Sequence, residues 1–297
     1  MPLWHNIAEM MDYYIPPLPS VYWIDITRIC NLRCIMCPQS RGLRRRRANM
    51  PMATFCRIID DIRANHPLVK LYMSGEPLLR GDLLDMIDYA GDRGCRTMVH
   101  TNATMLTKEL SERILSSSLD FLSFSFDGCT PEVYEMLRPP ATFERVRSNI
   151  EQYLDLRGDR DGGPHTTIEI IRMRETQAYL QDFVAHWRDR GVDDVHVTDY
   201  LTWHGSVEDR RVDGRTDGDG YNPCAAPFRH GCILSDGTVV PCCLDVNGRM
   251  PLGYVPEQSF RDVWVGRSYR QLRLQLLTGT ISPGSICDGC VNTFRET

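Results

Sequence analysis

Apolar and polar positions follow two alternating rhythms between residues 21 and 200. Short apolar runs rich in β-branched and aromatic residues have the composition of buried strands, and between them apolar residues recur every three or four positions. Leu83, Ile87 and Ala90, for example, share one face of a predicted helix. The predicted strands are 21–27, 68–74, 96–101, 120–126, 166–172 and 194–200, and the predicted helices are 82–94, 107–115, 142–154 and 176–187.

The alternation of strands and helices indicates the class of fold. Six strand–helix units predict an α/β protein with a parallel sheet and crossover helices. An open, partial (β/α)6 barrel accommodates six such units. A doubly wound open sheet is the alternative that the pattern leaves open.

The composition changes after residue 204. Residues 205–223 are polar and rich in Gly and Asp, which predicts a linker or mobile loop. The region 224–297 contains a predicted hairpin that turns at Asp236-Gly237, followed by one or two short helices. We therefore expect a core of residues 1–204, a linker of residues 205–223 and a small cysteine-rich domain of residues 224–297.

Composition and charge narrow the possible functions. The chain has 297 residues, of which 42% are hydrophobic, and its formal net charge of −5 disfavours a general nucleic-acid binder. No apolar stretch approaches the ~18 residues that span a bilayer, and the N-terminus lacks the pattern of a signal peptide. Twelve cysteines in a leaderless chain predict the reducing cytoplasm, where cysteines bind metals more often than they form disulfides.

Three cysteines follow the first predicted strand at a distinctive spacing. Cys30, Cys34 and Cys37 form C-x3-C-x2-C, which matches neither the common zinc spacing nor the C-x2-C-x2-C run of ferredoxins. Three thiolates can hold one face of a cubane and leave one metal open, and an open metal position binds a substrate or cosubstrate. Core packing or a zinc knuckle is the alternative interpretation.

This run, ITRICNLRCIMCPQS, resembles the signature of the radical S-adenosylmethionine (SAM) enzymes. The resemblance implies that the three cysteines hold a [4Fe–4S] cluster whose fourth iron is chelated by the amino and carboxylate groups of SAM. It also implies a partial (β/α)6 barrel. One electron from the reduced cluster would cleave SAM to a 5′-deoxyadenosyl radical that abstracts a hydrogen atom from an unactivated carbon.

Several strand ends resemble the SAM-contacting motifs of that family. Ligands bind at the carboxyl ends of parallel strands, where polar residues follow the second, third and fourth predicted strands. Ala103 stands where relatives often have the glycine of Thr-Asn-Gly. By resemblance, the residues expected to contact SAM are Ser74, Gly75, Glu76, Pro77, Asn102, Ser125, Asp127 and Arg138.

A second set of cysteines lies in the C-terminal region. Cys224, Cys242, Cys287 and Cys290 supply four thiolates, which make a closed site for either zinc or a [4Fe–4S] cluster. Beside a radical SAM core, this arrangement resembles the twitch form of the auxiliary-cluster domain, a shortened SPASM domain. The resemblance implies one auxiliary cluster, and hence two [4Fe–4S] clusters in total.

Cys243 directly follows a predicted ligand and is the candidate catalytic thiol. A thiol could return a hydrogen atom to a substrate radical from the opposite face, which gives epimerisation. Loss of an electron to the auxiliary cluster and of a proton would give dehydrogenation instead. We expect epimerisation.

The expected substrate is a small cationic sugar. The compact size and single auxiliary cluster resemble the aminoglycoside and aminocyclitol tailoring enzymes of antibiotic biosynthesis, such as 2-deoxy-scyllo-inosamine dehydrogenase and the neomycin C epimerase type. Weak substrate-binding candidates are Glu169, Asp199 and His204. Few residues precede the first predicted strand, so that no leader-binding domain is expected, although a peptide substrate recognised without one is an alternative.

The remaining expectations concern partners. A flavodoxin or ferredoxin is the expected electron donor, and the four-arginine run 44–47 could dock an acidic protein of this kind. No nucleic-acid or membrane partner is expected. A non-enzymatic zinc protein with two structural cysteine sets is the third hypothesis.

Overall fold

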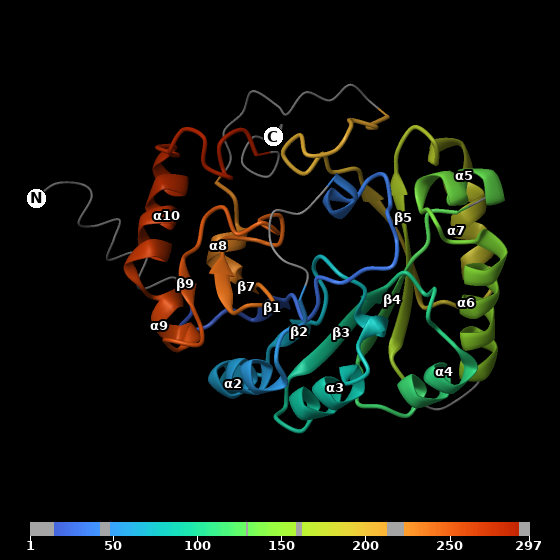
Figure 1. The fold of residues 1–297 in the computed structure, drawn as a ribbon, viewed down its shortest axis with the longest axis horizontal. Coiled ribbons are helices and arrows are strands. Elements are labelled where there is room, and N and C mark those ends of the chain that lie inside the picture. The colour runs from blue at the N-terminus through green and yellow to red at the C-terminus, as the bar shows by residue number, and fades with distance from the viewer. Residues whose placement is uncertain (1–14, 42–47, 129, 159–161, 213–222, 291–297) are drawn as a thin grey trace, which may run out of the picture.

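A curved nine-stranded sheet forms the centre of the protein in a computed structural model that describes residues 15–41, 48–128, 130–158, 162–212 and 223–290 (Figure 1). The strand order is β6-β5-β4-β3-β2-β1-β7-β8-β9. The pairs from β6 to β7 are parallel, whereas β8 and β9 are antiparallel to their neighbours. The strands are β1 (Val21–Ile24), β2 (Leu68–Lys70), β3 (Arg96–Thr101), β4 (Phe121–Ser125), β5 (His165–Arg172), β6 (Asp194–Asp199), β7 (His230–Ile233), β8 (Thr238–Val240) and β9 (Gly253–Tyr254).

Helices cover the outer face of this sheet, so that the predicted α/β partial barrel is confirmed (Figure 1). The doubly wound alternative is excluded because β1 to β6 follow one another in order across the sheet. The α-helices are α2 (Met52–Ile62), α3 (Leu83–Gly91), α4 (Lys108–Leu115), α5 (Pro131–Leu137), α6 (Phe143–Arg157), α7 (Leu180–Asp189), α8 (Ala226–Arg229), α9 (Phe260–Trp264) and α10 (Arg267–Thr278). Short 3-10 helices are η1 (Pro38–Arg41), η2 (Arg63–Asn65), η3 (Pro77–Leu79) and η4 (Gln177–Tyr179).

Alternation along β4 shows how the two faces of the sheet differ. Phe124 packs its ring against Tyr153 of α6 at 5.3 Å, because successive side chains of a strand point to opposite faces. Ser123 and Ser125 point the other way, toward the inner face. The sequence predicted this division of aromatic and polar residues between the two faces.

The C-terminal hairpin is part of the same sheet. β7 pairs in parallel with β1, with Trp23 opposite Cys232. Gly231 permits this pairing, since a Cβ there would lie 2.6 Å from the ring of Tyr22 and 2.7 Å from that of Phe260. The predicted turn at Asp236-Gly237 connects β7 to β8, and Gly237 has a φ of +90° that favours glycine.

Part of the predicted linker packs against the core. Val207 is buried in a cluster with Met36 and Tyr200, and the Tyr200 hydroxyl donates to the carbonyl of Glu208 at 2.7 Å. Residues 213–222 of that linker and the arginine run 44–47 lie outside the described residues.

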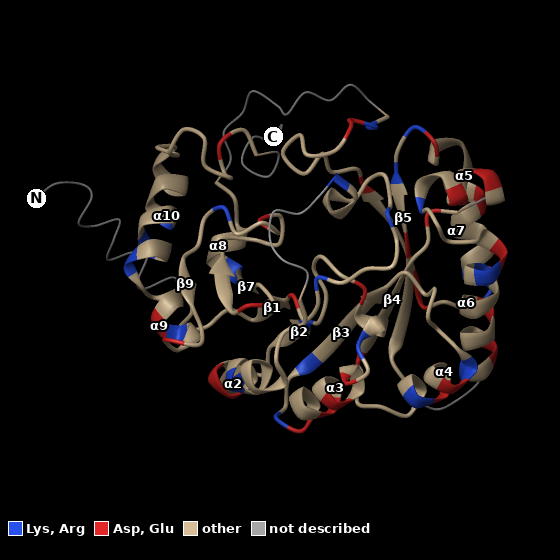
Figure 2. Cartoon of the chain, viewed as in Figure 1, with Lys and Arg blue, Asp and Glu red and all other residues tan. Residues whose placement is uncertain are grey.

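Acidic and basic side chains are mixed on the outer helices (Figure 2). On α6, for example, Arg147 lies within 3.3 Å of Glu144 and 3.7 Å of Glu151. The outer helical surface in this view therefore carries no field of a single sign. None of the helices in the described ranges is long and apolar enough to cross a membrane.

Candidate active site

The loop after β1 brings three thiols together. Cys37 donates its backbone N–H to the carbonyl of Cys34 at 3.1 Å, and the Leu32 N–H points to the sulfur of Cys30 at 3.5 Å. Burial raises the pKa of each of the three thiols, and a charge on Cys30 would raise the pKa of Cys34 and Cys37 further. The loop is fixed against the end of α5 by the N–H groups of Arg33 and Ile35, which donate to backbone carbonyls there.

Two polar side chains point at these sulfurs, one from the end of β3 and one from the end of α5. The Asn102 amide lies 4.0 Å from the sulfur of Cys30, and the Arg138 guanidinium lies 4.0 Å from that of Cys34. Donors of this kind stabilise thiolates, and they tune the potential of a cluster that thiolates hold. The structure therefore places two of the predicted SAM-contacting residues beside the three cysteines.

Glu76 links the end of β2 to the end of β3, which carries Asn102. Its carboxylate is 2% exposed and accepts hydrogen bonds from the Thr101 hydroxyl at 2.6 Å, the Asn102 N–H at 2.7 Å and the Leu78 N–H at 3.0 Å. Burial raises the pKa of Glu76, whereas these donors lower it. The adjoining Ala103 has a φ of +57°, which explains why glycine is easily accommodated at this position.

Gly75 lies where no side chain fits. A Cβ there would be 2.2 Å from the carbonyl oxygen of Thr27 and 2.8 Å from that of Ile29, so that the backbone of the second strand end rests on the cysteine loop. We expect Gly75→Ala to destabilise the protein by about 1–3 kcal/mol, because two backbone segments must separate. Gly81→Ala is the matched control, since nothing lies within 4 Å of its Cβ. Equal thermal midpoints of the two variants would contradict this interpretation.

Arg138, Asp127 and Ser125 form one buried unit. The guanidinium of Arg138 donates to Asp127 Oδ2 from Nε at 2.8 Å and also from Nη2, and it donates to the Ser125 hydroxyl at 2.5 Å. Asp127 is fully buried, and its second oxygen accepts from the Ile171 N–H at 2.7 Å. Asp127 was predicted to lie near SAM; the structure shows that its immediate task is to hold Arg138.

The second set of cysteines gathers below α10 and the β7–β8 hairpin. Cys287 and Cys290 are buried at the end of the described chain, and Cys224 packs against the main core. Charges on Cys224 and Cys287 raise the pKa of Cys242, although burial is the larger cause. These thiols are therefore neighbours in space, although the hairpin and the helices α8, α9 and α10 separate them in sequence.

The donor sets favour clusters over single ions. Among the residues that the structure describes, no three His, Cys, Asp or Glu side chains gather tightly enough to hold one metal ion. The thiolates of a cubane each bind a different iron and stand further apart than the ligands of one ion. Both sets consist of thiols, which suits iron–sulfur clusters.

Arg28 was not predicted from the sequence and connects the two cysteine regions. It is 1% exposed, lies 3.8 Å from Asp25, and donates to the carbonyl of Val246 at 2.6 Å. Gln39 donates to the carbonyl of Arg28 at 3.1 Å and also to that of Ser74. The available signal was a charged residue at the end of an apolar strand, two positions before the first cysteine.

Of the weak substrate candidates, only Glu169 lies on the inner face of the sheet. It is half-buried and accepts from the Thr198 hydroxyl at 3.3 Å. Asp199 is exposed on the edge strand and lies 3.8 Å from Arg172. His204 lines a cavity of about 110 Å³ together with Cys290, so the structure places it beside the second cysteine set.

Cys243, the candidate thiol donor, packs against the buried cluster of Cys232, Leu234 and Val240, as do Trp23 and Met73 of the first two strand regions. It is half-buried, whereas the neighbouring Cys232 in the same cluster is fully buried. The C-terminal segment therefore brings one partly accessible thiol to the inner face of β1 and β2.

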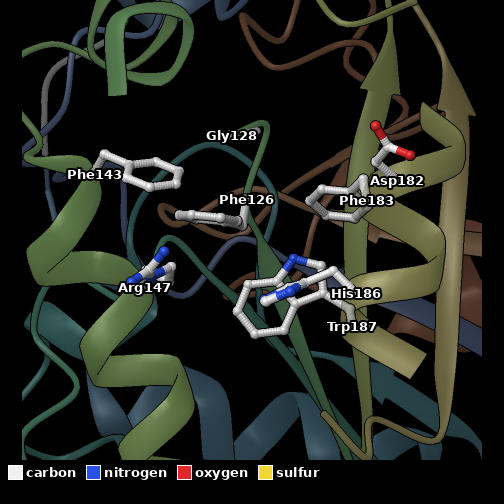
Figure 3. A pocket seen from close by; sticks show the side chains of 8 residues that line it. All are labelled: Phe126, Gly128, Phe143, Arg147, Asp182, Phe183, His186 and Trp187. Carbon is white, nitrogen blue, oxygen red and sulfur yellow. The ribbon is translucent and has the colours of Figure 1, made fainter. Parts of the chain in front are cut away.

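A larger cavity, of about 230 Å³, lies on the opposite side of the sheet. Figure 3 shows the rings of Phe126, Phe143 and Phe183 gathered at the end of β4, with Arg147 and His186 around them. None of the predicted site residues lines it. It belongs to the packing between α6, α7 and the sheet.

Comparison with known proteins adds the family. Residues 24–186 match the radical SAM superfamily, and residues 224–291 match the SPASM iron–sulfur cluster-binding domain. The chain is 25% identical to an AdoMet-dependent heme synthase of Methanosarcina barkeri over 92% of this chain and 91% of that protein. It is 27% identical to the mycofactocin maturase MftC of Mycobacterium ulcerans, over 61% of this chain but only 47% of that protein.

Solved structures share the fold. BtrN in complex with AdoMet and 2-DOIA aligns with a TM-score of 0.62 at 16% identity, over 93% of this chain and 92% of that one. Streptococcus suis SuiB bound to the precursor peptide SuiA aligns with a TM-score of 0.75 at 16% identity, over 97% of this chain and 73% of that one. At this identity the likeness concerns the fold alone.

The two matched segments carry the two cysteine sets, of which the first lies on the loop that contacts the Gly75 strand end. These domains use SAM, a [4Fe–4S] cluster that binds SAM, and auxiliary [4Fe–4S] clusters as cofactors. The zinc-protein hypothesis is thereby set aside. Because the first match covers more than half of the sequence and the fold agrees with it, the chain belongs to the radical SAM superfamily.

Proposed function

We propose that this enzyme epimerises a carbon of an aminoglycoside-type sugar in antibiotic biosynthesis, with Cys243 as the hydrogen-atom donor. The observation that carries the proposal is the position of Cys243, which packs against the same buried cluster as Trp23 and lies close enough to Lys70 of β2 for a charge on its sulfur to act on that lysine. Cys243 thus supplies a further thiol on the inner face, in addition to the three thiols of the β1 loop.

In this proposal Cys30, Cys34 and Cys37 hold the SAM-binding cluster, and Cys224, Cys242, Cys287 and Cys290 hold one auxiliary cluster. When reduced and bound to SAM, the first cluster supplies the 5′-deoxyadenosyl radical that removes a hydrogen atom from the substrate. A flavodoxin or ferredoxin is the proposed electron donor, which would reduce the first cluster and, with a proton from solvent, would supply the electron that returns the Cys243 thiyl radical to the thiol.

The strand ends would hold SAM. Ser74 and Gly75 are half-buried beside the cysteine loop, Pro77 is buried next to them, and Glu76 fixes their position relative to Asn102. Arg138 would bind the SAM carboxylate while Asp127 and Ser125 hold its guanidinium in place. Arg138 therefore has two tasks, one toward the cofactor and one toward the sulfur of Cys34.

The substrate would lie on the inner face, with an ammonium group near Glu169. BtrN supports a small-molecule substrate, because it aligns along nearly the whole of both chains and was solved in complex with 2-DOIA. Glu169 is the one carboxylate of the three weak candidates that the structure brings to this face.

The test is product mass after anaerobic turnover with SAM, reductant and an aminoglycoside panel in D2O. Epimerisation predicts a gain of one deuterium at one carbon together with 5′-deoxyadenosine. Loss of two hydrogens would show dehydrogenation instead. Cleavage of SAM with every sugar unchanged would exclude this substrate class.

Cys243→Ala is expected to abolish epimerisation while SAM cleavage continues, because hydrogen abstraction does not need this thiol. Product ratios and 5′-deoxyadenosine are measured in the same reaction. Cys56→Ala, a half-buried cysteine of α2, is the control and should retain both activities. Normal epimerisation by Cys243→Ala would disprove the donor role.

A second candidate function comes from the relatives. The M. barkeri heme synthase matches along nearly its full length, and SuiB was solved with its precursor peptide, so a tetrapyrrole or a peptide is the alternative substrate. Either would replace the sugar if the panel gives SAM cleavage without sugar product.

A further inference from the structure

Lysine is rare in this chain, and one of its two lysines lies on the inner face of the sheet. The sequence has 34 basic residues, of which only Lys70 and Lys108 are lysines. Lys108 is 58% exposed on α4 and lies 4.0 Å from Glu112. Lys70 is half-buried in β2, where Val69 on the opposite face is fully buried in the core.

The ammonium group of Lys70 rests on an aromatic ring. Its Nζ lies 4.3 Å from the centre of the Trp23 ring, which attracts cations through its negative face. No protein oxygen within the described ranges accepts a hydrogen bond from it. Burial lowers the pKa of Lys70, which shows that solvent only partly replaces these missing partners. A compact ammonium with free donors is suited to bind an oxygen of a ligand.

Two further polar side chains, those of Tyr72 and His100, lie near Lys70 and have few hydrogen-bond partners among the described residues. The rings of Tyr72 and His100 are 5.2 Å apart, and the Tyr72 hydroxyl reaches only the sulfur of Met98, at 3.6 Å. Burial lowers the pKa of His100, so that its imidazole is neutral near pH 7. Both side chains are half-buried and so keep polar atoms accessible on the inner face.

Glu169 provides the opposite charge on the same surface. Burial is the largest influence on the pKa of Lys70, Tyr72 and His100, and the Glu169 carboxylate is a smaller influence that acts to raise each of them. It forms no ion pair with Lys70 within 4 Å, although both side chains are described. A cation and an anion thus stand apart on one inner surface, with a hydroxyl and an imidazole among them.

We propose that Lys70 and Glu169 are the two charged ends of a substrate subsite, in which Glu169 binds an ammonium group and Lys70 binds a hydroxyl or oxyanion of the same small molecule. A second ammonium group at the Lys70 end is rejected. This inference takes its substrate class from the proposed function. It adds where the amino group of a sugar would lie. A polycation with ammonium groups at both ends would not be a substrate.

Binding to the holoenzyme with SAM tests this, measured anaerobically by calorimetry. The probes are glucosamine, glucosamine 6-phosphate and 2,6-diamino-2,6-dideoxyglucose, which differ only in the group at one position. We expect the phosphate to bind about tenfold tighter than the hydroxyl compound, and the diamine to bind about tenfold more weakly, because like charges repel in a partly buried site.

Variants of Lys70 give the decisive comparison. Lys70→Met should make the three affinities equal, and Lys70→Glu should reverse their order. Lys108→Met is the matched control and should preserve the wild-type order, whereas Glu169→Gln should weaken all three probes by a similar factor. An unchanged order in Lys70→Met, or failure of all three probes to bind the wild type, overturns the proposal.

A measurement on the unaltered protein covers the case of unstable variants. An amine-reactive reagent should label Lys70 and Lys108, and glucosamine 6-phosphate should protect Lys70 alone by at least about fivefold. Equal labelling with and without the probe overturns the subsite. Both tests measure binding and not turnover. The order of the three probe affinities can therefore hold while epimerisation fails, and epimerisation can occur while Lys70 has no effect on binding.

Discussion

Cys34→Ser is expected to reduce SAM cleavage below detection while the protein remains folded. Serine keeps the size of the side chain, but its hydroxyl does not replace a thiolate as an iron ligand, and two thiolates do not retain a cubane. Cys34 also receives the guanidinium of Arg138 at 4.0 Å, so its loss removes one contact of that group, while Asp127 and Ser125 still hold it. The measurements are 5′-deoxyadenosine formation and iron content after anaerobic reconstitution.

Iron content separates this effect from general instability. About half of the iron should remain, because the proposed auxiliary cluster uses other cysteines. Cys95→Ser tests a buried cysteine in neither set and should retain all of the iron. If Cys34→Ser retained full iron and SAM cleavage, Cys34 would not be a ligand.

Arg138→Met is expected to produce the largest loss of stability. It leaves the carboxylate of Asp127 fully buried with the Ile171 N–H as its remaining donor. Breaking a buried ion pair from one side costs about 3–5 kcal/mol, since the remaining charge is uncompensated. At about 2 °C per kcal/mol for a chain of this size, the thermal midpoint should fall by roughly 6 °C or more.

Two further variants distinguish a buried charge from simple loss of contact. Arg172→Met removes an exposed partner of Asp199 and should cost at most about 1 kcal/mol. The double variant Asp127→Asn/Arg138→Met should recover most of the lost stability, because no buried charge is left over. If the double variant were as unstable as the two single effects combined, packing and not charge would explain the result.

The sequence pattern located the strands well but not their ends. β3 has the predicted bounds, whereas β2 was predicted to reach residue 74 and ends at Lys70. The reason is local: Ser74 directs its N–H and hydroxyl to the carboxylate of Asp25, at 3.1 and 2.9 Å, and not to a neighbouring strand. Side chains continue to alternate beyond the last backbone hydrogen bond to the neighbouring strand. A prediction from periodicity therefore overestimates the length of a strand that ends in a binding site.

Contacts between distant segments could not be predicted from local pattern. The spacing of the cysteines indicated both cysteine sites, but the pairing of β7 with β1 depends on Gly231 meeting Tyr22 across about two hundred residues. Arg28 had only its place shortly before Cys30 as a local signal, and Lys70 had none that separates it from a surface cation. Their roles follow from Val246 and Trp23, which only the fold brings to them.

The parallel pairing of β1 with β7 has a consequence for electron transfer. β1 leads into the loop of Cys30, and β7 leads through the hairpin to Cys242, so that both proposed cluster sites begin from one strand ladder. Their separation is therefore set by strand register and by the bond from Arg28 to Val246 at 2.6 Å. A hinge between the two cofactor-bearing segments would have to break that ladder. The distance over which an electron travels between them is consequently established when the chain folds, and turnover does not have to adjust it.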